Sequence, residues 1–536
     1  SSLGRATPGT LAMIPRGVAL ALGLAAVAQP LAQATDCEEQ GETCTAEAAS
    51  GFADGSSRYH WPYARGKAGL LGLTNFTGPT NLEKAFWWKW HHPDGRFHTM
   101  LKGAPLFDDQ RNIYLQAVDQ LYKFSPDGKL LWKYWPSVHV PKWNGVANCP
   151  SLHNGAIFGS TVNGFVWAAS METGKELWIR KVYKSVPPKH EAVGGDTGSI
   201  DAYGGVVVSA GEIWNPNVVA GNRRVTGLNA TDGQQLWEFE VQPGMWNFAG
   251  HFLPADSHGV EEATVLFQDV EGRLYRLSLK SGTLVWKSGG SPGCWTDGSM
   301  NIGPNGVAYT VTVHGSLNGP GYTGGPDMPG YVFAIRLRDG EVLWKRKLPR
   351  PPNSMPVIGP LGEGGRLLLV LPIGQQAGDP PGWQDILRNW DYEENTTWHW
   401  KAWFMHKVSL LMGDWQQKIW ENPTLPNDVY ALDPETGNTV WRWEGIDYRR
   451  VSAAGDEEGL LVRIQEGKMF GCLPCPWGFP AIDASGTIYV GNQNGKLYAL
   501  RDTKSSGRGV EAVSTFDTEA CFLCASGGGT FAPCIM

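Results

Sequence analysis

Six segments of the chain share one pattern of apolar and polar positions. In each segment, alternating apolar residues lead into a turn that contains glycine, and the next apolar run ends on tryptophan four residues after that glycine. Alternation with a period of two is typical of a β-strand, and glycine tolerates the positive φ of tight turns. Each segment therefore predicts a β-hairpin. The six segments are residues 121–132, 166–178, 225–237, 274–286, 332–344 and 429–441.

A second pair of strand-like runs precedes the hairpins, as in NGAIFGSTVNG at 154–164 and SGTIYVGNQNG at 485–495. Each unit thus has four strands and one repeated tryptophan, and the units are unevenly spaced along the chain. This pattern indicates propeller blades joined by loops of unequal length. A four-stranded sheet cannot bury both faces alone, so the sheets must stack, and tryptophan suits the gap between neighbours. We therefore interpret the repeated tryptophans as structural. They are Trp132, Trp178, Trp237, Trp286, Trp344 and Trp441.

The sixth hairpin carries a family resemblance. Its residues 431–437, followed by Trp441, resemble the tryptophan-docking motif of the PQQ-repeat, or quinoprotein alcohol dehydrogenase-like, β-propellers. The resemblance covers roughly residues 81–518. It implies an all-β propeller of four-stranded antiparallel blades. The family includes dehydrogenases that use pyrroloquinoline quinone (PQQ) and calcium and typically have eight blades. It also includes non-catalytic members such as a bacterial outer-membrane assembly lipoprotein, so fold alone does not assign a function.

Both ends of the repeat array contain incomplete copies. A degenerate seventh copy begins at Leu497 and has Val513 where tryptophan would stand. The run AFWWKW at 85–90 resembles an outer strand without its own hairpin, and CASGGGTFAPCIM at 524–536 resembles the opening of another blade. A ring has no exposed sheet edge only if its first and last blades join. We therefore expect seven full repeats plus a split or partial eighth.

The amino end has the features of an export signal. Arg16 precedes the apolar stretch 17–27, and Ala32-Gln33-Ala34 forms a small-x-small cleavage site. The apolar stretch is shorter than the ~20 residues of a membrane-spanning helix. These features divide the chain into a signal peptide at 1–34, a leader at 35–80 and a propeller at 81–536, with an insertion at 375–427.

The insertion contains a predicted helix. Between residues 398 and 420, apolar side chains recur at spacings of three and four, which predicts one apolar face. This face could dock on a partner or a membrane surface, or the helix could cover one mouth of the propeller. We favour the cover, because the polar face is not strongly basic as in lipid-surface helices. The apolar positions are Trp400, Phe404, Val408, Leu411, Trp415 and Ile419.

Nine cysteines fit an oxidising compartment, where most of them can pair. Cys149, Cys294 and two Cys-x-x-Cys pairs each precede the first strand of a unit, so we expect them near one rim. The two pairs have the spacing of a four-thiolate zinc site, but export favours disulfides. These pairs are Cys472 with Cys475 and Cys521 with Cys524, while Cys37 and Cys44 are expected to close a loop in the leader.

The net charge and the sequons bear on nucleic-acid binding and on glycosylation. The net charge of -7 is spread along the chain without a basic run, which argues against nucleic-acid binding. Three Asn-x-Ser/Thr sequons are candidate N-glycosylation sites if the source is eukaryotic. They are Asn75, Asn229 and Asn395.

Signatures of the dehydrogenase members are missing from the sequence. There is no Cys-Cys dipeptide on which a quinone would stack, and no Cys-x-x-Cys-His haem motif. We therefore expect a monomeric, secreted or extracytoplasmic propeller that binds or scaffolds a protein partner through its loops or the 375–427 insertion. Two alternatives stay open. One is a PQQ-dependent oxidoreductase with quinone and calcium in the central funnel, and the other is a membrane-associated assembly factor.

Overall fold

Strands are the only regular elements that the computed structural model describes. The described residues belong to the unit Gly51–Met536, and no helix among them is long and apolar enough to cross a membrane. They are residues 58–63, 88–90, 105–117, 120–138, 149–161, 163–183, 199–211, 222–245, 248–296, 300–314, 329–352, 355–360, 366–374, 425–448, 480–482, 488–492 and 496–500.

Each of the first three sheets has four strands. The first sheet contains β1 (Leu106–Phe107), β2 (Ile113–Gln116), β3 (Leu121–Phe124) and β4 (Leu130–Tyr134). The second contains β5 (Ser151–His153), β6 (Ala156–Ser160), β7 (Phe165–Ser170) and β8 (Glu176–Lys181). The third contains β9 (Asp201–Tyr203), β10 (Val206–Gly211), β11 (Asn222–Asn229) and β12 (Gln235–Met245).

The remaining sheets vary in strand number. The fourth contains β13 (His251–Leu253), β14 (Thr264–Gln268), β15 (Arg273–Ser278) and β16 (Leu284–Gly289). The fifth has an extra short strand and contains β17 (Cys294–Trp295), β18 (Asn301–Ile302), β19 (Val307–His314), β20 (Gly330–Arg336) and β21 (Val342–Leu348). The sixth contains β22 (Val357–Pro360), β23 (Leu367–Ile373), β24 (Leu425–Leu432) and β25 (Thr439–Tyr448). The seventh contains β26 (Ala481–Ile482), β27 (Ile488–Asn492) and β28 (Lys496–Leu500).

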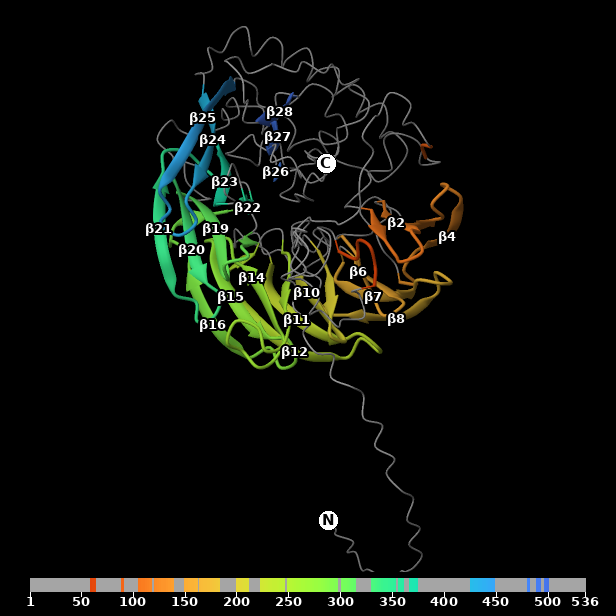
Figure 1. Cartoon of the computed structure of the whole chain (residues 1–536). Coiled ribbons are helices and arrows are strands. Elements are labelled where there is room, and N and C mark those ends of the chain that lie inside the picture. The colour runs from red at the N-terminus through yellow and green to blue at the C-terminus, as the bar shows by residue number, and fades with distance from the viewer. Residues whose placement is uncertain are drawn as a thin grey trace, which may run out of the picture. The chain divides into compact units, whose positions relative to one another are not determined.

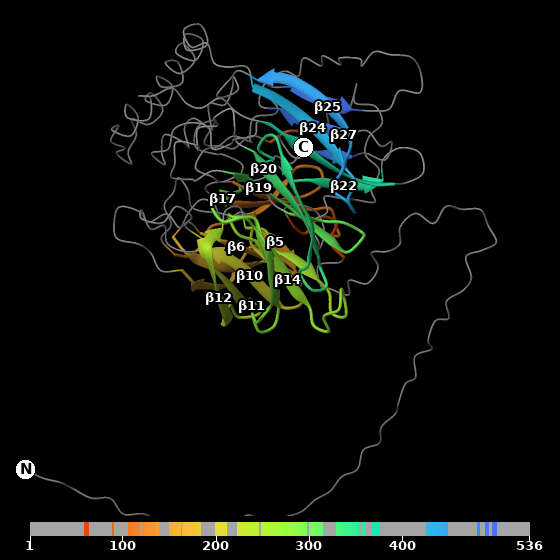
Figure 2. The same cartoon turned by 90° about the vertical axis from the view of Figure 1, so that its left-hand side faces the viewer.

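Within the sheets, neighbouring strands run antiparallel in chain order, with β18 as a side strand on β19. The fourth strands β12, β16, β21 and β25 lie at the outside of the array (Figure 1). Figure 2 shows the sheet of β24 next to that of β27, and their side chains share one apolar cluster. Successive four-stranded antiparallel sheets of this kind are the blades of an all-β propeller. Six sheets of at least four strands and a three-stranded seventh fall within the described residues, and the rest of the predicted blades lies outside them.

The docking tryptophans connect one sheet to the next. Trp178 lies in the second sheet, yet its Nε1–H donates to the Ala230 carbonyl of the third sheet at 2.9 Å. A Cβ atom placed on Gly233, in the hairpin turn of the third sheet, would lie 2.5 Å from the Trp178 ring. Because Gly233 has φ +72°, only glycine fits both the turn and the ring. Each glycine therefore contacts the tryptophan of the preceding repeat. The equivalent pairs are Trp132 with Gly174, Trp237 with Gly282, Trp286 with Gly340, and Trp344 with Gly437.

The array also contains docking contacts at its two ends. Trp88 donates its Nε1–H to the Pro126 carbonyl at 3.1 Å, and its ring lies against Gly128 in the hairpin turn of the first sheet. Residues 88–90 therefore supply the first sheet with the tryptophan that a preceding blade would provide. At the other end, Trp441 packs against the cluster that includes Ile488 and Val490 of the seventh sheet.

Part of the leader is built into the propeller, contrary to the boundary placed at residue 81. Trp61 exchanges two backbone hydrogen bonds with Phe107 of β1, at 3.0 and 2.9 Å. The hydroxyl of buried Tyr59 accepts from the Gly155 amide at 2.8 Å, and that of buried Tyr63 donates to the Ala202 carbonyl at 2.7 Å. Residues 58–63 thus contact the first strands or first turns of three sheets, a long-range contact that local patterning cannot reveal.

Replacing a docking glycine tests this architecture. In Gly282→Ala, the new methyl group would lie 2.6 Å from the Trp237 ring, which donates to the Leu279 carbonyl at 2.8 Å. Gly155→Ala is the matched control, because Gly155 also has positive φ but nothing lies within 4 Å of its Cβ position. Both variants pay about 1–2 kcal/mol for the left-handed backbone.

We expect Gly282→Ala to lose about 1–3 kcal/mol more than the control, through displacement of the ring. Urea unfolding followed by tryptophan fluorescence measures the difference. Equal destabilisation in the two variants would contradict the docking contact.

Candidate functional site

The outer strands carry a row of exposed apolar side chains. In six sheets the pairing of the third and fourth strands shifts register immediately before the docking tryptophan, so one residue of the fourth strand has no cross-strand partner. That residue is leucine or valine every time, and its exposed fraction ranges from 39% to 55%. We call these six residues the bulge row. They are Leu131, Leu177, Leu236, Val285, Leu343 and Val440.

The bulge row supplies six of the ten large apolar side chains that are exposed in the described part of the chain. The other large apolar side chains exposed there are Leu130, Leu284, Val342 and Trp88. The first three stand one position before a bulge residue, and Trp88 docks in the same manner as the repeat tryptophans. A β-bulge increases the local twist of an edge strand and turns a side chain in a new direction. The outer edges of the sheets therefore present apolar side chains at one recurring position.

Basic side chains flank much of this row. The residue after the docking tryptophan is an exposed lysine or arginine in four of the six sheets. Charged residues on an edge strand oppose uncontrolled strand pairing, because an incoming strand would have to accommodate them. The combination of apolar and basic groups instead favours a ligand that offers apolar and acidic groups. The four residues are Lys133, Lys287, Lys345 and Arg442.

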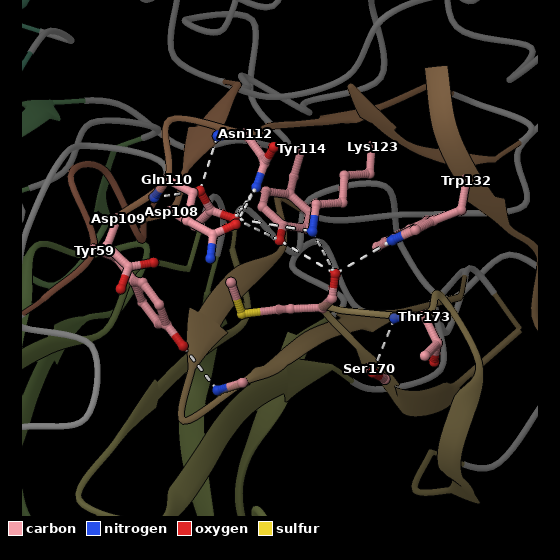
Figure 3. A network of polar contacts seen from close by, with 12 residues as sticks. Tyr59, Asp108, Asp109, Gln110, Asn112, Tyr114, Lys123, Trp132, Ser170 and Thr173 are labelled. Atoms are coloured by element: carbon pink, nitrogen blue, oxygen red, sulfur yellow. Dashed lines mark hydrogen bonds and ion pairs between the residues drawn. The ribbon is translucent and has the colours of Figure 1, made fainter. Parts of the chain in front are cut away.

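A buried polar network lies between the first and second sheets (Figure 3). The Asp108 carboxylate accepts from the Asn112 amide and side chain, both at 2.8 Å, and from the Tyr114 hydroxyl at 3.0 Å. Lys123 Nζ lies 3.9 Å from this carboxylate and donates to the Met171 carbonyl of the second sheet at 2.7 Å. Burial lowers the pKa of Lys123, while Asp108 opposes that shift. The network fastens the first sheet to the second.

The fourth sheet repeats the hydrogen-bond pattern of Asp108 at a different turn. Asp269 accepts from the backbone amides of Glu271 and Arg273, both at 2.9 Å, and from the side chains of Arg273 and Tyr275. Asp108 receives the same bonds from residues two, four and six positions later. The shared pattern Asp-x-Glx-x-(Asn/Arg)-x-Tyr is visible in DDQRNIY and DVEGRLY, but sequence reasoning missed it. Burial raises the pKa of Asp269 to about 6 against the effect of these donors.

Two sheets place a cation opposite the docking tryptophan, where four others have alanine or glycine. Lys123 shares the Met171 carbonyl with Trp132, whose Nε1 lies 3.2 Å from it. Arg276 donates at 2.8 Å to the Leu337 carbonyl, which also accepts from Trp286 at 3.0 Å. Arg276 is fully buried among neutral acceptors, and burial lowers its pKa to about 10. Both cations therefore reinforce a docking contact.

The predicted site residues are placed as follows. Cys149 and Cys294 are both buried. Cys149 forms an isolated parallel β-bridge with the backbone of Ser199, and Cys294 lies in β17 of the fifth sheet. Asn229 is half-buried, and its Oδ1 accepts from the Thr231 amide at 2.8 Å in a hairpin turn. The other candidates lie outside the described residues, so the signal peptide, disulfides, thiolate site and glycosylation stay predictions. They are Cys37, Cys44, Cys472, Cys475, Cys521, Cys524, Asn75 and Asn395.

The insertion falls between β23 and β24, and residues 425–427 already belong to β24. Its predicted helix lies outside the described residues. Among the residues that are described, no three histidine, cysteine, aspartate or glutamate side chains are grouped to hold a metal ion. PQQ with calcium stays a prediction.

Comparisons with known proteins agree with the repeat. A family profile described as outer membrane protein assembly factor BamB matches residues 111–292 and 218–360. The assembly factor BamB of Yersinia pestis is 24% identical over 300 residues, which cover 46% of this chain and 68% of that protein. Tetrathionate hydrolase of Acidithiobacillus ferrooxidans is 19% identical over 322 residues, which cover 57% of this chain and 59% of the hydrolase. This chain thus spans less than two thirds of the hydrolase.

Solved structures with a similar chain path include the quinohemoprotein alcohol dehydrogenase from Comamonas testosteroni. It is 13% identical, with a TM-score of 0.46, and the match covers 82% of this chain and 71% of the dehydrogenase. The family profile runs from the start of β2 to β22 and so contains five of the docking tryptophans.

Asp269→Asn should change how stability depends on pH. The folded pKa of Asp269 is about 6, whereas an unfolded aspartate titrates near about 4. The folded state therefore retains the proton to higher pH, and the stability gained from this proton is complete below about pH 4 and lost as pH rises through 6.

Urea unfolding between about pH 4.5 and pH 7 measures this dependence. We expect the native chain to lose more unfolding free energy over this interval than Asp269→Asn. Asp339→Asn is the control, because hydrogen bonds from Arg336 lower the pKa of exposed Asp339 and it stays ionised throughout. If the unfolding free energy of Asp269→Asn depended on pH as steeply as that of the native chain, the raised pKa of Asp269 would be contradicted.

Proposed function

Because this chain belongs to the PQQ-repeat β-propeller family, we propose that it is an extracytoplasmic scaffold that binds a protein partner along its outer strands. The names of the BamB relatives support a place outside the cytoplasm, since they are described as outer membrane protein assembly factors. The matched segment also covers more than two thirds of the Yersinia pestis protein.

The bulge row is the observation that carries the proposal. An exposed leucine or valine adds little to folding, and single exposed apolar residues are common on protein surfaces. Six at one structural position, directly beside a docking tryptophan, form an ordered array on successive sheets. Exposed apolar groups that recur in this way mark surfaces at which other proteins bind. The docking tryptophans fasten each sheet to the next, and an ordered surface loses less entropy on binding.

The partner we propose is an extended segment that alternates apolar and acidic residues. Within the described residues, each outer strand pairs on one side only. Its second edge can therefore hydrogen-bond an added strand, as in known modes of peptide recognition. Apolar side chains of the segment would cover the bulge row, and acidic ones would meet Lys287 and Lys345.

Photocross-linking tests the proposal at a defined place. A photoreactive amino acid is placed at Leu236 in one protein and at its exposed neighbour Gln235 in another, and both are expressed in the source organism. We expect a specific adduct from Leu236 only, with a partner that mass spectrometry identifies. Purified partner should then bind Leu236→Lys about tenfold more weakly than the native chain, whereas Gln235→Lys binds normally.

Both substitutions are on the surface, so their unfolding free energies should stay within about 0.5 kcal/mol of the native value. Native binding by Leu236→Lys, or no adduct above the Gln235 control, would exclude the bulge row as the docking surface. Tight binding of PQQ with calcium, accompanied by alcohol-dependent dye reduction, would overturn the scaffold role itself.

A further inference from the structure

Cys294 and His314 face each other directly across two strands of the fifth sheet. They are register partners in the pair β17–β19, so their side chains leave the same face of the sheet. The distance between Cys294 Sγ and His314 Nδ1 is 3.8 Å. The cysteine is 5% exposed, whereas the histidine lies at the surface. The imidazole thus stands between a sheltered sulfur and solvent.

The surroundings of this pair are polar and belong to two sheets. Thr312 precedes His314 by two residues and shares its face, and the Thr312 methyl group contacts the position of Gly272 in the fourth sheet. The buried Thr312 hydroxyl has no acceptor or donor within normal hydrogen-bond distance among the described residues. Thr312 favours the thiolate form of Cys294, which lowers the pKa of that thiol against the larger effect of burial. This hydroxyl is therefore available to a group that approaches Cys294.

Charged groups act on the sulfur from both sheets. Lys345 donates to the Ser291 hydroxyl at 3.0 Å, and the Ser291 carbonyl accepts from the Cys294 amide at 2.9 Å. The Lys345 charge favours the thiolate, whereas Glu271 of the fourth sheet opposes it. Burial outweighs the favourable contributions and raises the pKa of Cys294 above its usual value. The sulfur is therefore a protonated thiol near neutral pH, and it needs a base to become a nucleophile.

We propose that Cys294 and His314 form a nucleophilic thiol–imidazole pair that exchanges with small disulfides. The pair has the arrangement of an activated nucleophile, with the base adjacent to the thiol and slightly farther than a tight hydrogen bond, as is common without substrate. The low exposure of Cys294 restricts the substrate to small molecules.

The exchange step is balanced without an added oxidant. His314 Nδ1, in the tautomer protonated on Nε2, takes the proton as Cys294 Sγ attacks one sulfur of the disulfide. A bond forms between Sγ and that sulfur while the disulfide bond breaks, and its electron pair leaves with the other sulfur. The leaving sulfur takes the proton from the imidazolium. The products are a mixed disulfide on Cys294 and one free thiol.

Glutathione disulfide is the probe for this chemistry. The folded, full-length chain is incubated with it near neutral pH, and modification of the peptide that contains Cys294 is followed by mass spectrometry. We expect the Cys294 peptide to gain one glutathione. The rate should fall by about 100-fold in His314→Asn, the size of effect typical of a lost general base. His258→Asn, in the β13–β14 loop of the fourth sheet, is the matched control and should react at the native rate.

Chemical rescue separates catalysis from a structural role. His314→Gly leaves space for added imidazole, which should restore much of the lost rate at Cys294 without changing the unfolding midpoint. No modification of Cys294 in the folded native chain would overturn the proposal. So would a native rate in His314→Asn, or a loss in His314→Gly that imidazole cannot restore.

Discussion

Each docking tryptophan packs against a glycine of the following sheet, and this contact sets the conditions for the rest of the fold. A four-stranded sheet has two faces to bury, and a tryptophan buries about 150–250 Å² while keeping one polar atom that needs a partner. In this chain the indole N–H finds a backbone carbonyl of the next sheet, as Trp237 does with Leu279. The ring takes the space that a side chain at Gly282 would occupy. Each of these sheets is thereby joined to the next one along the chain.

The same local geometry also creates the surface that we propose for binding. To turn the tryptophan towards the next sheet, the outer strand shifts register by one residue, and the residue left over points to solvent. Leu236 and Val285 are therefore exposed because Trp237 and Trp286 are buried. The packing of the tryptophan and the exposure of the residue before it thus have one origin.

Some sheets depart from the repeat by carrying a buried cation or a buried thiol at a position where the other sheets have none. Lys123 and Arg276 replace a small residue and add a cationic donor to a docking carbonyl. In the fifth sheet, Cys294 of β17 and His314 of β19 occupy facing positions on neighbouring strands. Buried cations need hydrogen bonds in place of water, and a buried thiol needs a base to react. Both needs are met by neighbouring strands or sheets, which explains why these features are dispersed along the chain.

The sequence by itself determined the all-β repeat, the hairpins and the structural role expected of the tryptophans, because strand alternation and turn glycines are local properties of the chain. It also located the interval between β23 and β24 that holds the insertion. Only the tertiary structure decided that each glycine contacts the tryptophan of the preceding repeat, and that Tyr59 and Tyr63 belong to the propeller. It likewise placed Cys294 beside His314, 20 residues later. These features depend on strand register and on packing between sheets, and neither is encoded in the spacing of residues along one repeat.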